Sequence, residues 1–296
     1  MQIAYLIAAH HQPNHLAKLI RTLDSPGCTF FIHIDAKVDE KMFKEAAGSR
    51  SNIVFIQPRG EITWGGFSIV RATLALLSAA LEFDRSFQRF CLLSGSDFPI
   101  KNNAQILSDF ASIKEFMSVN RKLDPSQHDG HHNRYIGFYW FIDSPDESLK
   151  NLSGRMPCVK PYEGFALYHG SGWWALTRDC VEYILGFIAS DVTYCKFFEH
   201  VFCSDEIFFH SILKQSPFAS RITHDFETAP DQAEYAASNE HGSHYIDWNA
   251  PGVRLPKVLD LQDFDKLLHS KCLFARKFDE QESGELIARL EKMLAG

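Results

Sequence analysis

The sequence lacks the short motifs that mark the commonest nucleotide, hydrolase and zinc sites. It contains no P-loop, no Gly-x-Gly-x-x-Gly, no Gly-x-Ser-x-Gly and no His-Glu-x-x-His. No apolar run approaches the roughly 18 residues that a membrane-spanning helix needs. These absences argue against a P-loop phosphate site, a nucleophile-elbow hydrolase, a zincin-type protease and an integral membrane protein.

The sequence also lacks a surplus of basic residues and any paired-cysteine motif. It has 30 Lys and Arg against 37 Asp and Glu, a net charge of −7 and a pI near 6.0, so we expect no nucleic-acid partner. The seven cysteines are scattered and include no Cys-x-x-Cys, which predicts reduced core thiols. Residues 1–9 lack the basic start of a signal peptide and lead directly into an apolar strand. We therefore expect a cytoplasmic protein.

The composition is that of an ordinary globular protein. Hydrophobic residues make up 45% and charged residues 23% of the 296 positions, which excludes wholesale disorder. The 25 Phe residues predict a core rich in aromatic side chains. Because neither an internal repeat nor a low-complexity linker interrupts the chain, we predict a single domain over residues 1–296.

Strand and helix patterns alternate through the first hundred residues. Apolar runs predict strands at 3–8, 28–34, 53–56 and 89–94, and helical spacing predicts helices near 16–23 and from Ser68 onward. This alternation predicts an α/β fold with a Rossmann-type parallel sheet flanked by helices, whose nucleotide-binding half covers about residues 1–118. Ligands bind such sheets beyond the carboxyl ends of the strands. Those ends carry His10, Asp35 and the segment Ser94–Asp97, our first candidate binding residues.

The pattern is less regular in the second half, over about residues 119–296. Between about 120 and 164 the sequence is polar, contains Trp140 and Phe141, and predicts long loops that build a substrate pocket. Residues 230–256 also have a loop-like composition. The other expected elements are a strand at 170–176 and helices at 178–188, 202–213, 260–268 and 282–294.

Ser204-Asp205-Glu206 opens one of these expected helices. Ser204 has the character of an N-cap, and acids in a first turn complement the helix dipole, so one interpretation is that both acids are only capping charges. The apolar residues around them allow a second interpretation. Partial burial would raise the pKa of a carboxylate toward the range useful to a general base.

A basic string at 271–279 alternates cations with aromatic and small residues. It is either a solvated basic edge or a phosphate clamp, since Arg forks match phosphate oxygens and Lys supplies a point charge. Arg254 lies upstream at a distance that one short helix would fill, so it could join the same site.

The 14 histidines suggest a metal site, but their spacing does not support one. The candidates are His10-His11, His131-His132 and the pair His241 and His244, and adjacent histidines on a strand point apart. The segment after the fourth strand also lacks an Asp-x-Asp pair. We therefore expect no metal cofactor. Gly170-Ser171-Gly172 is interpreted as a close-packed strand start that lets a ligand approach the backbone.

Taken together, these segments resemble the core-2/I-branching β-1,6-N-acetylglucosaminyltransferase family, which includes the peptide O-xylosyltransferases. The resemblance covers nearly the whole chain except about 120–165, where acceptor choice should lie. The matching stretches are Ala8–His11, Phe31–Asp35, Ile62–Gly66, Leu92–Lys101, Gly170–Trp174, Ser204–Glu206 and Leu273–Phe278. The chain looks like a compact bacterial-type member without the membrane anchor and stem of the animal enzymes. Its scattered thiols do not follow the disulfide framework of those enzymes.

The resemblance implies a GT-A fold, a UDP-sugar donor, inversion at the anomeric carbon and no divalent metal. Glu206 falls on the general base of the family, and Arg254 and Lys277 fall on the two cations that bind the donor diphosphate. Asp35 falls on the carboxylate near the uridine. His10 and Asp97 are further donor-binding candidates, and Trp173 and Trp248 are candidates for binding the acceptor.

The expected reaction is transfer of a sugar, GlcNAc in the first instance, to a glycan or lipid-linked glycan in β linkage, within bacterial surface polysaccharide synthesis. A lipid-linked acceptor would bring the protein to the inner face of the membrane. Three alternatives stay open: transfer of xylose or of a different hexose from the corresponding UDP-sugar, a non-catalytic protein that binds UDP-sugars or glycans, and a metal-dependent hydrolase.

Overall fold

The computed structural model describes residues 1–124, 139–153, 166–229 and 238–295. Its centre is an eight-stranded sheet with the order β3-β2-β1-β4-β8-β6-β7, in which β9 also pairs with β6. The strands are β1 (Ile3–Ala9), β2 (Cys28–Ile34), β3 (Ile53–Phe55), β4 (Arg89–Ser94), β6 (Glu115–Lys122), β7 (Tyr168–Gly170), β8 (Ala175–Thr177) and β9 (Ile222–Asp225). The first four pair in parallel, whereas β8 runs antiparallel to β4 and β6. The α/β prediction is confirmed, with a sheet that is mixed rather than parallel throughout.

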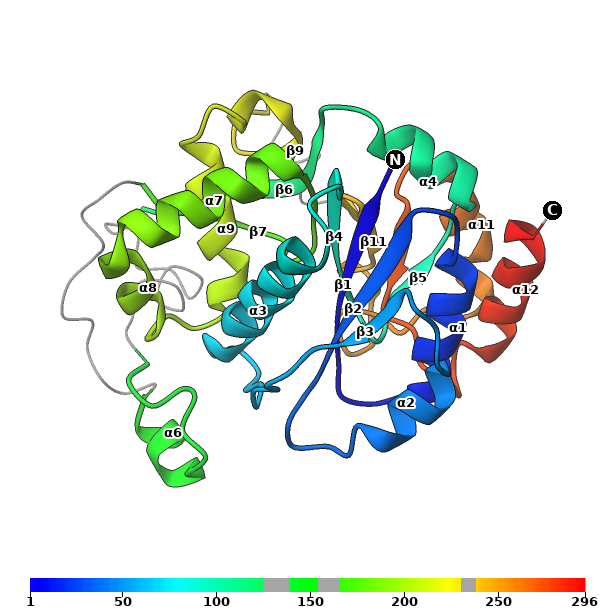
Figure 1. Ribbon diagram of the computed structural model, residues 1–296, viewed down its shortest axis with the longest axis horizontal. Coiled ribbons are helices and arrows are strands. Elements are labelled where there is room, and N and C mark those ends of the chain that lie inside the picture. Colours follow the sequence, from blue (N-terminus) through cyan, green and yellow to red (C-terminus); the bar gives the residue numbers. More distant parts are fainter. Residues whose placement is uncertain (125–138, 154–165, 230–237, 296) are drawn as a thin grey trace.

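Helices cover both faces of this sheet (Figure 1). One face carries α1 (Pro13–Leu23), α2 (Lys41–Ala47), α4 (Asn103–Phe110), α11 (Phe264–His269) and α12 (Gly284–Leu294). The other carries α3 (Ser68–Phe83), α7 (Arg178–Ser190), α8 (Val192–Phe198) and α9 (Phe208–Lys214). Alternate residues of β2 enter the two cores, with Phe30 and Ile32 in the first and Phe31 in the second. Because both faces are covered, β2 is apolar along nearly its whole length.

A second, smaller sheet joins distant parts of the sequence. Its order is β10 (Glu240–His241), β11 (His244–Ile246), β12 (Phe274–Arg276) and β5 (Phe98–Pro99). It corrects the expectation that residues 230–256 are loop throughout. Antiparallel pairing of β12 with β5 brings the C-terminal basic string beside the segment that follows β4. The amide of Phe278 donates to the Ser96 carbonyl at 2.8 Å, which fixes this contact.

Two expected elements are each divided in the structure. The helix expected at 202–213 is a 3₁₀ turn, η1 (Ser204–Glu206), followed by α9, with Cys203 at a φ of 52° before it. The N-cap position is occupied by Cys203, and Ser204 Oγ is buried without a hydrogen-bond partner among the described residues, so the predicted N-cap role of Ser204 is wrong. The strand expected at 170–176 is β7 and β8, which pair with different parts of the sheet.

The boundary between halves that we predicted near residue 118 falls inside β6. Because β6 pairs with β7, β8 and β9, the two halves share one sheet. The remaining short elements are α6 (Glu147–Ser153), which projects from the body in Figure 1, and the 3₁₀ turns η2 (Ala219–Arg221) and η3 (Leu261–Asp263).

Two expectations from composition can be compared with the described residues. Within them, no helix has the length and apolar character to cross a bilayer. The six described cysteines are free thiols, four of them buried, as expected for core residues, and Cys158 lies outside the described ranges.

Candidate active site

Two predicted donor-binding residues lie where β1 and β2 end. Asp35 is buried, and its amide donates to the Ala9 carbonyl at 3.0 Å. Its carboxylate is held by Lys37, whose Nζ lies 2.8 Å from Oδ2 and whose amide lies 2.9 Å from Oδ1. His10 is exposed beyond β1. Burial lowers the pKa of His10, the Asp35 charge opposes this, and the Lys277 charge lowers the pKa further, so these three residues share one neighbourhood.

Lys277 follows β12 and is the centre of a group of cations. Its side chain makes no ion pair with another described residue. Burial lowers the pKa of Lys277, and the charges of Arg276 and then Arg254 lower it further. Like charges raise one another's free energy unless an anion lies among them. The arrangement is therefore suited to an anionic ligand.

Arg276 is the most confined of these cations. Its guanidinium carbon lies 4.1 Å from the centre of the Trp173 ring, a cation–π contact. Its Nε lies 3.7 Å from Asp97 Oδ1, and both Nε and Nη1 are buried without a hydrogen-bond partner among the described residues. Burial lowers the pKa of Arg276, and the charges of Asp97, Asp205 and Glu206 oppose this. Arg276 therefore stands between the cations and the acidic segment.

The structure gives Asp97 a different place from the one predicted. Its side chain is completely buried, so it does not reach the surface where a donor would bind. The Ser94 amide and hydroxyl donate to its carboxylate at 2.6 and 2.8 Å, and His244 Nε2 lies 3.4 Å away. Burial alone would raise the pKa of Asp97, but Arg276 and His244 bring it below its ordinary value. Asp97 thus lies inside the protein beside Arg276 rather than at the contact with a donor that we predicted.

The acidic segment η1 carries two carboxyl groups in unlike surroundings. Glu206 is 30% exposed, and its Oε2 lies 3.2 Å from His169 Nε2. Asp205 lies against the β7–β8 connection, where a Cβ on Gly172 would stand 2.8 Å from its Oδ2. Burial, followed by the charge of Glu206, raises the pKa of Asp205 to about 7. The raised pKa expected for one acid of this segment is therefore found at Asp205.

The Gly-Ser-Gly segment packs closely against other parts of the protein at both glycines. A Cβ on Gly170 would collide with the Ser118 carbonyl oxygen and with the His210 ring. A Cβ on Gly172 would crowd Asp205. The close packing that we expected here is confirmed, because a strand carbonyl and a carboxylate occupy the space where the two Cβ atoms would stand, and approach of a ligand to this backbone stays a prediction.

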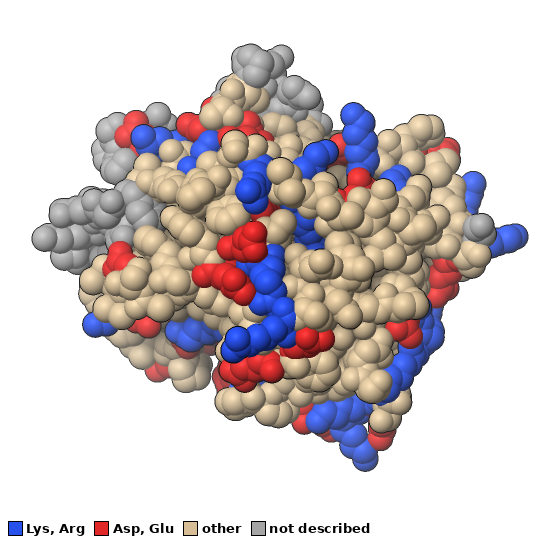
Figure 2. All heavy atoms as spheres, turned by 45° about the horizontal axis from the view of Figure 1, so that its top comes forward, with Lys and Arg blue, Asp and Glu red and all other residues tan. Residues whose placement is uncertain are grey.

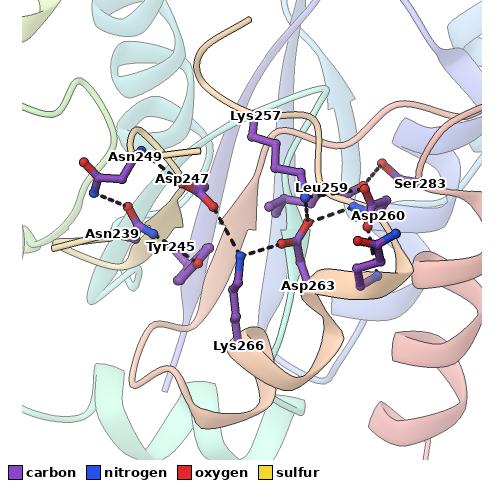
Figure 3. Close-up of polar contacts among 11 residues, drawn as sticks. Asn239, Tyr245, Asp247, Asn249, Lys257, Leu259, Asp260, Asp263, Lys266 and Ser283 are labelled. Atoms are coloured by element: carbon purple, nitrogen blue, oxygen red, sulfur yellow. Dashed lines mark hydrogen bonds and ion pairs between the residues drawn. The ribbon is translucent and has the colours of Figure 1, made fainter. Parts of the chain in front are cut away.

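Arg254 is exposed on the loop between β11 and η3, and this loop is held at both ends (Figure 3). The Lys257 amide donates to the Asp247 carbonyl at 3.0 Å, and Lys257 Nζ lies 2.6 Å from Asp263 Oδ2. Lys266 Nζ bridges Asp263 Oδ1 at 3.0 Å and Asp247 Oδ2 at 3.6 Å. These contacts brace the loop that presents Arg254.

The braced loop is also tied to the strand that carries the other cations. The Leu259 amide donates to the Lys277 carbonyl at 2.8 Å, and the Lys277 amide approaches the Lys257 carbonyl at 3.4 Å. Trp248 lies on the same loop and is 44% exposed, but none of the described contacts joins it to Glu206 or Trp173. Of the two predicted acceptor residues, Trp173 contacts Arg276, whereas Trp248 lies on the loop that carries Arg254, and both acceptor roles stay predictions.

Sequence reasoning assigned no role to His169 and Trp64, which the structure brings to this region, and it considered Asp205 and Arg276 only as members of the acidic segment and the basic string. Trp64 is 76% exposed, and its ring lies 5.3 Å from that of Phe202, on the segment leading to Glu206. Trp64 stood in a matching stretch, and Arg276 in the basic string, so a signal existed for both. His169 had only its place beside the Gly-Ser-Gly segment.

The described residues include no group of three or more His, Cys, Asp or Glu side chains arranged to hold a metal ion. The His10 and His11 rings lie 4.3 Å apart at their centres, and both are partly or wholly exposed. His131 and His132 fall outside the described ranges. Metal independence stays a prediction.

With this geometry in view, we compared the chain with known proteins. The family model described as Core-2/I-Branching enzyme matches residues 3–268. Xylosyltransferase 2 of Bos taurus and xylosyltransferase 1 of Homo sapiens are each 25% identical to it, over 100% of this chain and 34% and 31% of their own lengths. The chain thus spans about a third of these relatives.

Another relative is the bovine β-1,3-galactosyl-O-glycosyl-glycoprotein β-1,6-N-acetylglucosaminyltransferase. It is 25% identical over 94% of this chain and 66% of its own length. Among solved structures, the galactosyltransferase LgtC in complex with donor and acceptor sugar analogues aligns with 100% of this chain and 97% of its own. That alignment has a TM-score of 0.35 and 12% identity.

Proposed function

Because this chain belongs to the Core-2/I-Branching enzyme family, we propose that it is an inverting, metal-independent glycosyltransferase that uses a UDP-sugar. The names of its relatives describe transfer of xylose and of N-acetylglucosamine. We propose N-acetylglucosamine as the first candidate sugar and xylose as the second. The acceptor is a hydroxyl of a glycan, free or lipid-linked, and the new bond has β configuration.

The observation that carries this proposal is a group of three neighbouring cations, Arg254, Arg276 and Lys277, in which only Arg276 has an ion-pair partner among the described residues, the buried Asp97. Arg276 has buried donors without acceptors, and Lys277 has a pKa lowered by burial and by its two neighbours. A diphosphate would supply the missing negative charge and acceptor oxygens. Fixed donors of this kind contribute roughly 3 kcal/mol each to stabilising charge that develops in a transition state.

Glu206 is the proposed base that takes the proton from the acceptor hydroxyl. Its carboxylate is partly exposed and lies within electrostatic range of Arg276, so a base and a leaving-group site adjoin each other. In the proposed step the acceptor oxygen attacks the anomeric carbon while the bond from that carbon to the β-phosphate oxygen breaks. The hydroxyl proton passes to Glu206, and the bonding electrons leave with UDP.

Residues near Lys277 and Glu206 are proposed to contact the nucleoside of the donor and the acceptor. Asp35 and His10, beyond β1 and β2, lie beside Lys277 and are proposed to contact the nucleoside side of the donor. The exposed Trp64 ring contacts Phe202, two residues before the acidic segment begins, and the partly buried Trp173 ring contacts Arg276. Aromatic rings pack well against the apolar faces of sugars, so we propose them for the acceptor side.

The biological setting proposed is cytoplasmic synthesis of a bacterial surface polysaccharide, at the inner face of the membrane where the acceptor is lipid-linked. An exposed apolar and basic loop supports this setting, because Trp248, Val253 and Leu255 are 44%, 49% and 43% exposed around Arg254. Such side chains favour the interfacial region of a bilayer.

The test is release of UDP by the purified chain from UDP-GlcNAc, UDP-xylose, UDP-glucose and UDP-galactose in the presence of EDTA. We expect release from one donor above the others, increased by a matching glycan acceptor. UDP binding without turnover of any donor would favour the non-catalytic alternative. Turnover that is lost in EDTA and restored by Mn²⁺ would overturn the metal-free mechanism.

A further inference from the structure

His169 and Glu206 form a side-chain pair that the function proposed above does not use. His169 Nε2 lies 3.2 Å from Glu206 Oε2. The imidazole is 14% exposed and the carboxylate 30% exposed, so the glutamate is the outer member of the pair. A carboxylate only accepts hydrogen bonds, and Nε2 is therefore the protonated nitrogen when Glu206 is ionised.

Two hydrogen bonds, one on each side of His169 in the sequence, hold this part of the chain against helix α9. On one side of His169, the Tyr168 amide donates to Ser211 Oγ at 2.9 Å. On the other side, the Ser171 carbonyl lies 2.8 Å from His210 Nε2. Ser211 and His210 both belong to α9, the helix that follows η1. Strand β7 is thus fastened to the element that continues from Glu206.

In the contact between His210 and Ser171, the imidazole is the hydrogen-bond donor. Burial, with a further contribution from the His169 charge, lowers the pKa of His210 to about 3, so its ring is neutral near pH 7. A carbonyl accepts only, hence His210 Nε2–H is the donor to Ser171. The absence of a side chain at Gly170 lets β7 lie against His210 and the Ser118 carbonyl. His169 is therefore presented by a strand with little freedom to move.

We propose that His169 is a positioning residue for the general base, an inference that rests on the function proposed above. Its Nε2–H donates to Glu206 Oε2 and fixes the carboxylate, which leaves Oε1 directed toward the acceptor hydroxyl. The proton of that hydroxyl goes to Glu206 and not to the imidazole, because the carboxylate is the more exposed group. A glutamate has three rotatable side-chain bonds, so an anchoring donor removes much of its freedom.

The same pair admits an opposite assignment, in which Glu206 orients the imidazole and His169 takes the proton. The two assignments differ in what a glutamine at position 169 would do. A glutamine amide can still donate a hydrogen bond to a carboxylate, but it cannot act as a base. A phenylalanine can do neither.

The kinetic test compares His169→Gln and His169→Phe with the unaltered chain, measuring UDP release from UDP-GlcNAc and UDP-xylose with water as the acceptor. We expect His169→Phe to lower kcat by about 10- to 100-fold with the donor KM changed less than about twofold. His169→Gln should stay within about fivefold of the unaltered chain. His224→Phe, in β9 and outside the site, is the matched control and should leave kcat unchanged.

Two kinetic results would overturn the proposal. A His169→Phe protein as active as the unaltered chain would remove any role for the contact. A His169→Gln protein as inactive as His169→Phe, with the same melting temperature, would assign the proton to the imidazole. Circular dichroism of each variant separates these results from loss of fold.

A spectroscopic readout keeps the inference testable even if no UDP-sugar is turned over, in which case the proposed function fails by itself. The ¹⁵N signals of His169 should report protonated Nε2 near pH 7, and Glu206→Ala should shift them. An unprotonated Nε2, or signals unaffected by Glu206→Ala, would contradict the inferred contact.

Discussion

At the scale of single residues, Glu206 is the side chain whose loss should separate chemistry from binding. Glu206→Gln keeps the size and hydrogen-bonding shape of the side chain but cannot accept a proton. We expect turnover to fall by about 10²- to 10⁴-fold, the range usual for a positioned base, with UDP affinity within about twofold. Coupled measurement of UDP release and UDP binding checks both parts. Near-normal turnover would transfer the role of base to another group.

Substitution of Asp205 should change how the free energy of unfolding depends on pH. Burial raises the pKa of Asp205 to about 7, above the value of an unfolded Asp, near 3.9. The unfolded chain thus loses this proton first, and stability falls as pH rises from about 4 to about 7. Asp205→Asn cannot titrate, so its stability relative to the unaltered chain should increase by about 2 to 4 kcal/mol across that range and level off above it.

Chemical denaturation at several pH values measures this difference. Asp109→Asn, at an exposed position on α4, serves as the control for a general charge effect. A difference between Asp205→Asn and the unaltered chain that does not change with pH would show that Asp205 is ionised in the folded protein throughout.

Residue types marked the segments of the candidate site. Glu206, Arg254 and Lys277 stand in acidic and basic segments with unusual neighbours, and the family resemblance then assigned their predicted roles. The distinction between Asp205 and Glu206 could not be found, because it depends on the different neighbours that the 3₁₀ turn gives them: Asp205 faces Gly172 and Glu206 faces His169. The contact of Asp97 with Arg276 depends likewise on β5 and β12, whose pairing joins residues far apart in sequence.

At the scale of elements, two glycines allow the close packing of β7 and of the β7–β8 connection, and they differ in how well they should tolerate replacement by alanine. A Cβ at position 170 would meet a strand carbonyl, which cannot move without breaking the sheet. A Cβ at position 172 would meet the end of the Asp205 side chain, which can rotate away. We expect Gly170→Ala to cost about 3 kcal/mol or more of unfolding free energy, and Gly172→Ala about 1 kcal/mol.

Gly186→Ala provides the matched control for this comparison. Position 186 lies on the exposed side of α7 with open space around it, so alanine there should stabilise the protein by about 0.5 to 1 kcal/mol. Urea denaturation gives the unfolding free energy of each of the three variants and therefore ranks their stabilities. Equal losses for Gly170→Ala and Gly172→Ala would contradict the described packing.

The elements differ in how well the sequence predicted them. Strands β1, β2 and β4 were found within one residue at each end, because buried parallel strands are continuous apolar runs. The helix expected at 202–213 was wrong, since its apolar spacing continues across a break that backbone geometry at Cys203 and Ile207 imposes. The two- and three-residue strands β5, β10, β11 and β12 are too short for any periodicity to appear.

At the scale of the whole molecule, the site is built from both ends of the chain. The first strands supply Asp35 and His10, and β12, near the C-terminal end of the sequence, supplies Arg276 and Lys277. Helix α12 then packs on the core formed by β1 and α1. The predicted donor and acceptor halves are therefore successive in the sequence, but they are not separate in the structure around the candidate site.

Charge over the molecule agrees with a local anion site rather than a basic surface. On the face shown in Figure 2, Lys and Arg side chains lie among Asp and Glu side chains and form no broad basic area. The net charge is −7. Attraction of a diphosphate must therefore come from a few placed cations, and it should weaken as salt is added.

The central claim is that these cations bind the diphosphate of UDP without a metal ion, and calorimetric titration of UDP in EDTA tests it most directly. We predict that the unaltered chain binds UDP, that Lys277→Ala weakens binding by about 10- to 100-fold, and that Lys271→Ala, an exposed cation of the same basic string, leaves it unchanged. Binding that appears only with Mn²⁺, or that is equal in Lys277→Ala and the unaltered chain, would contradict the account.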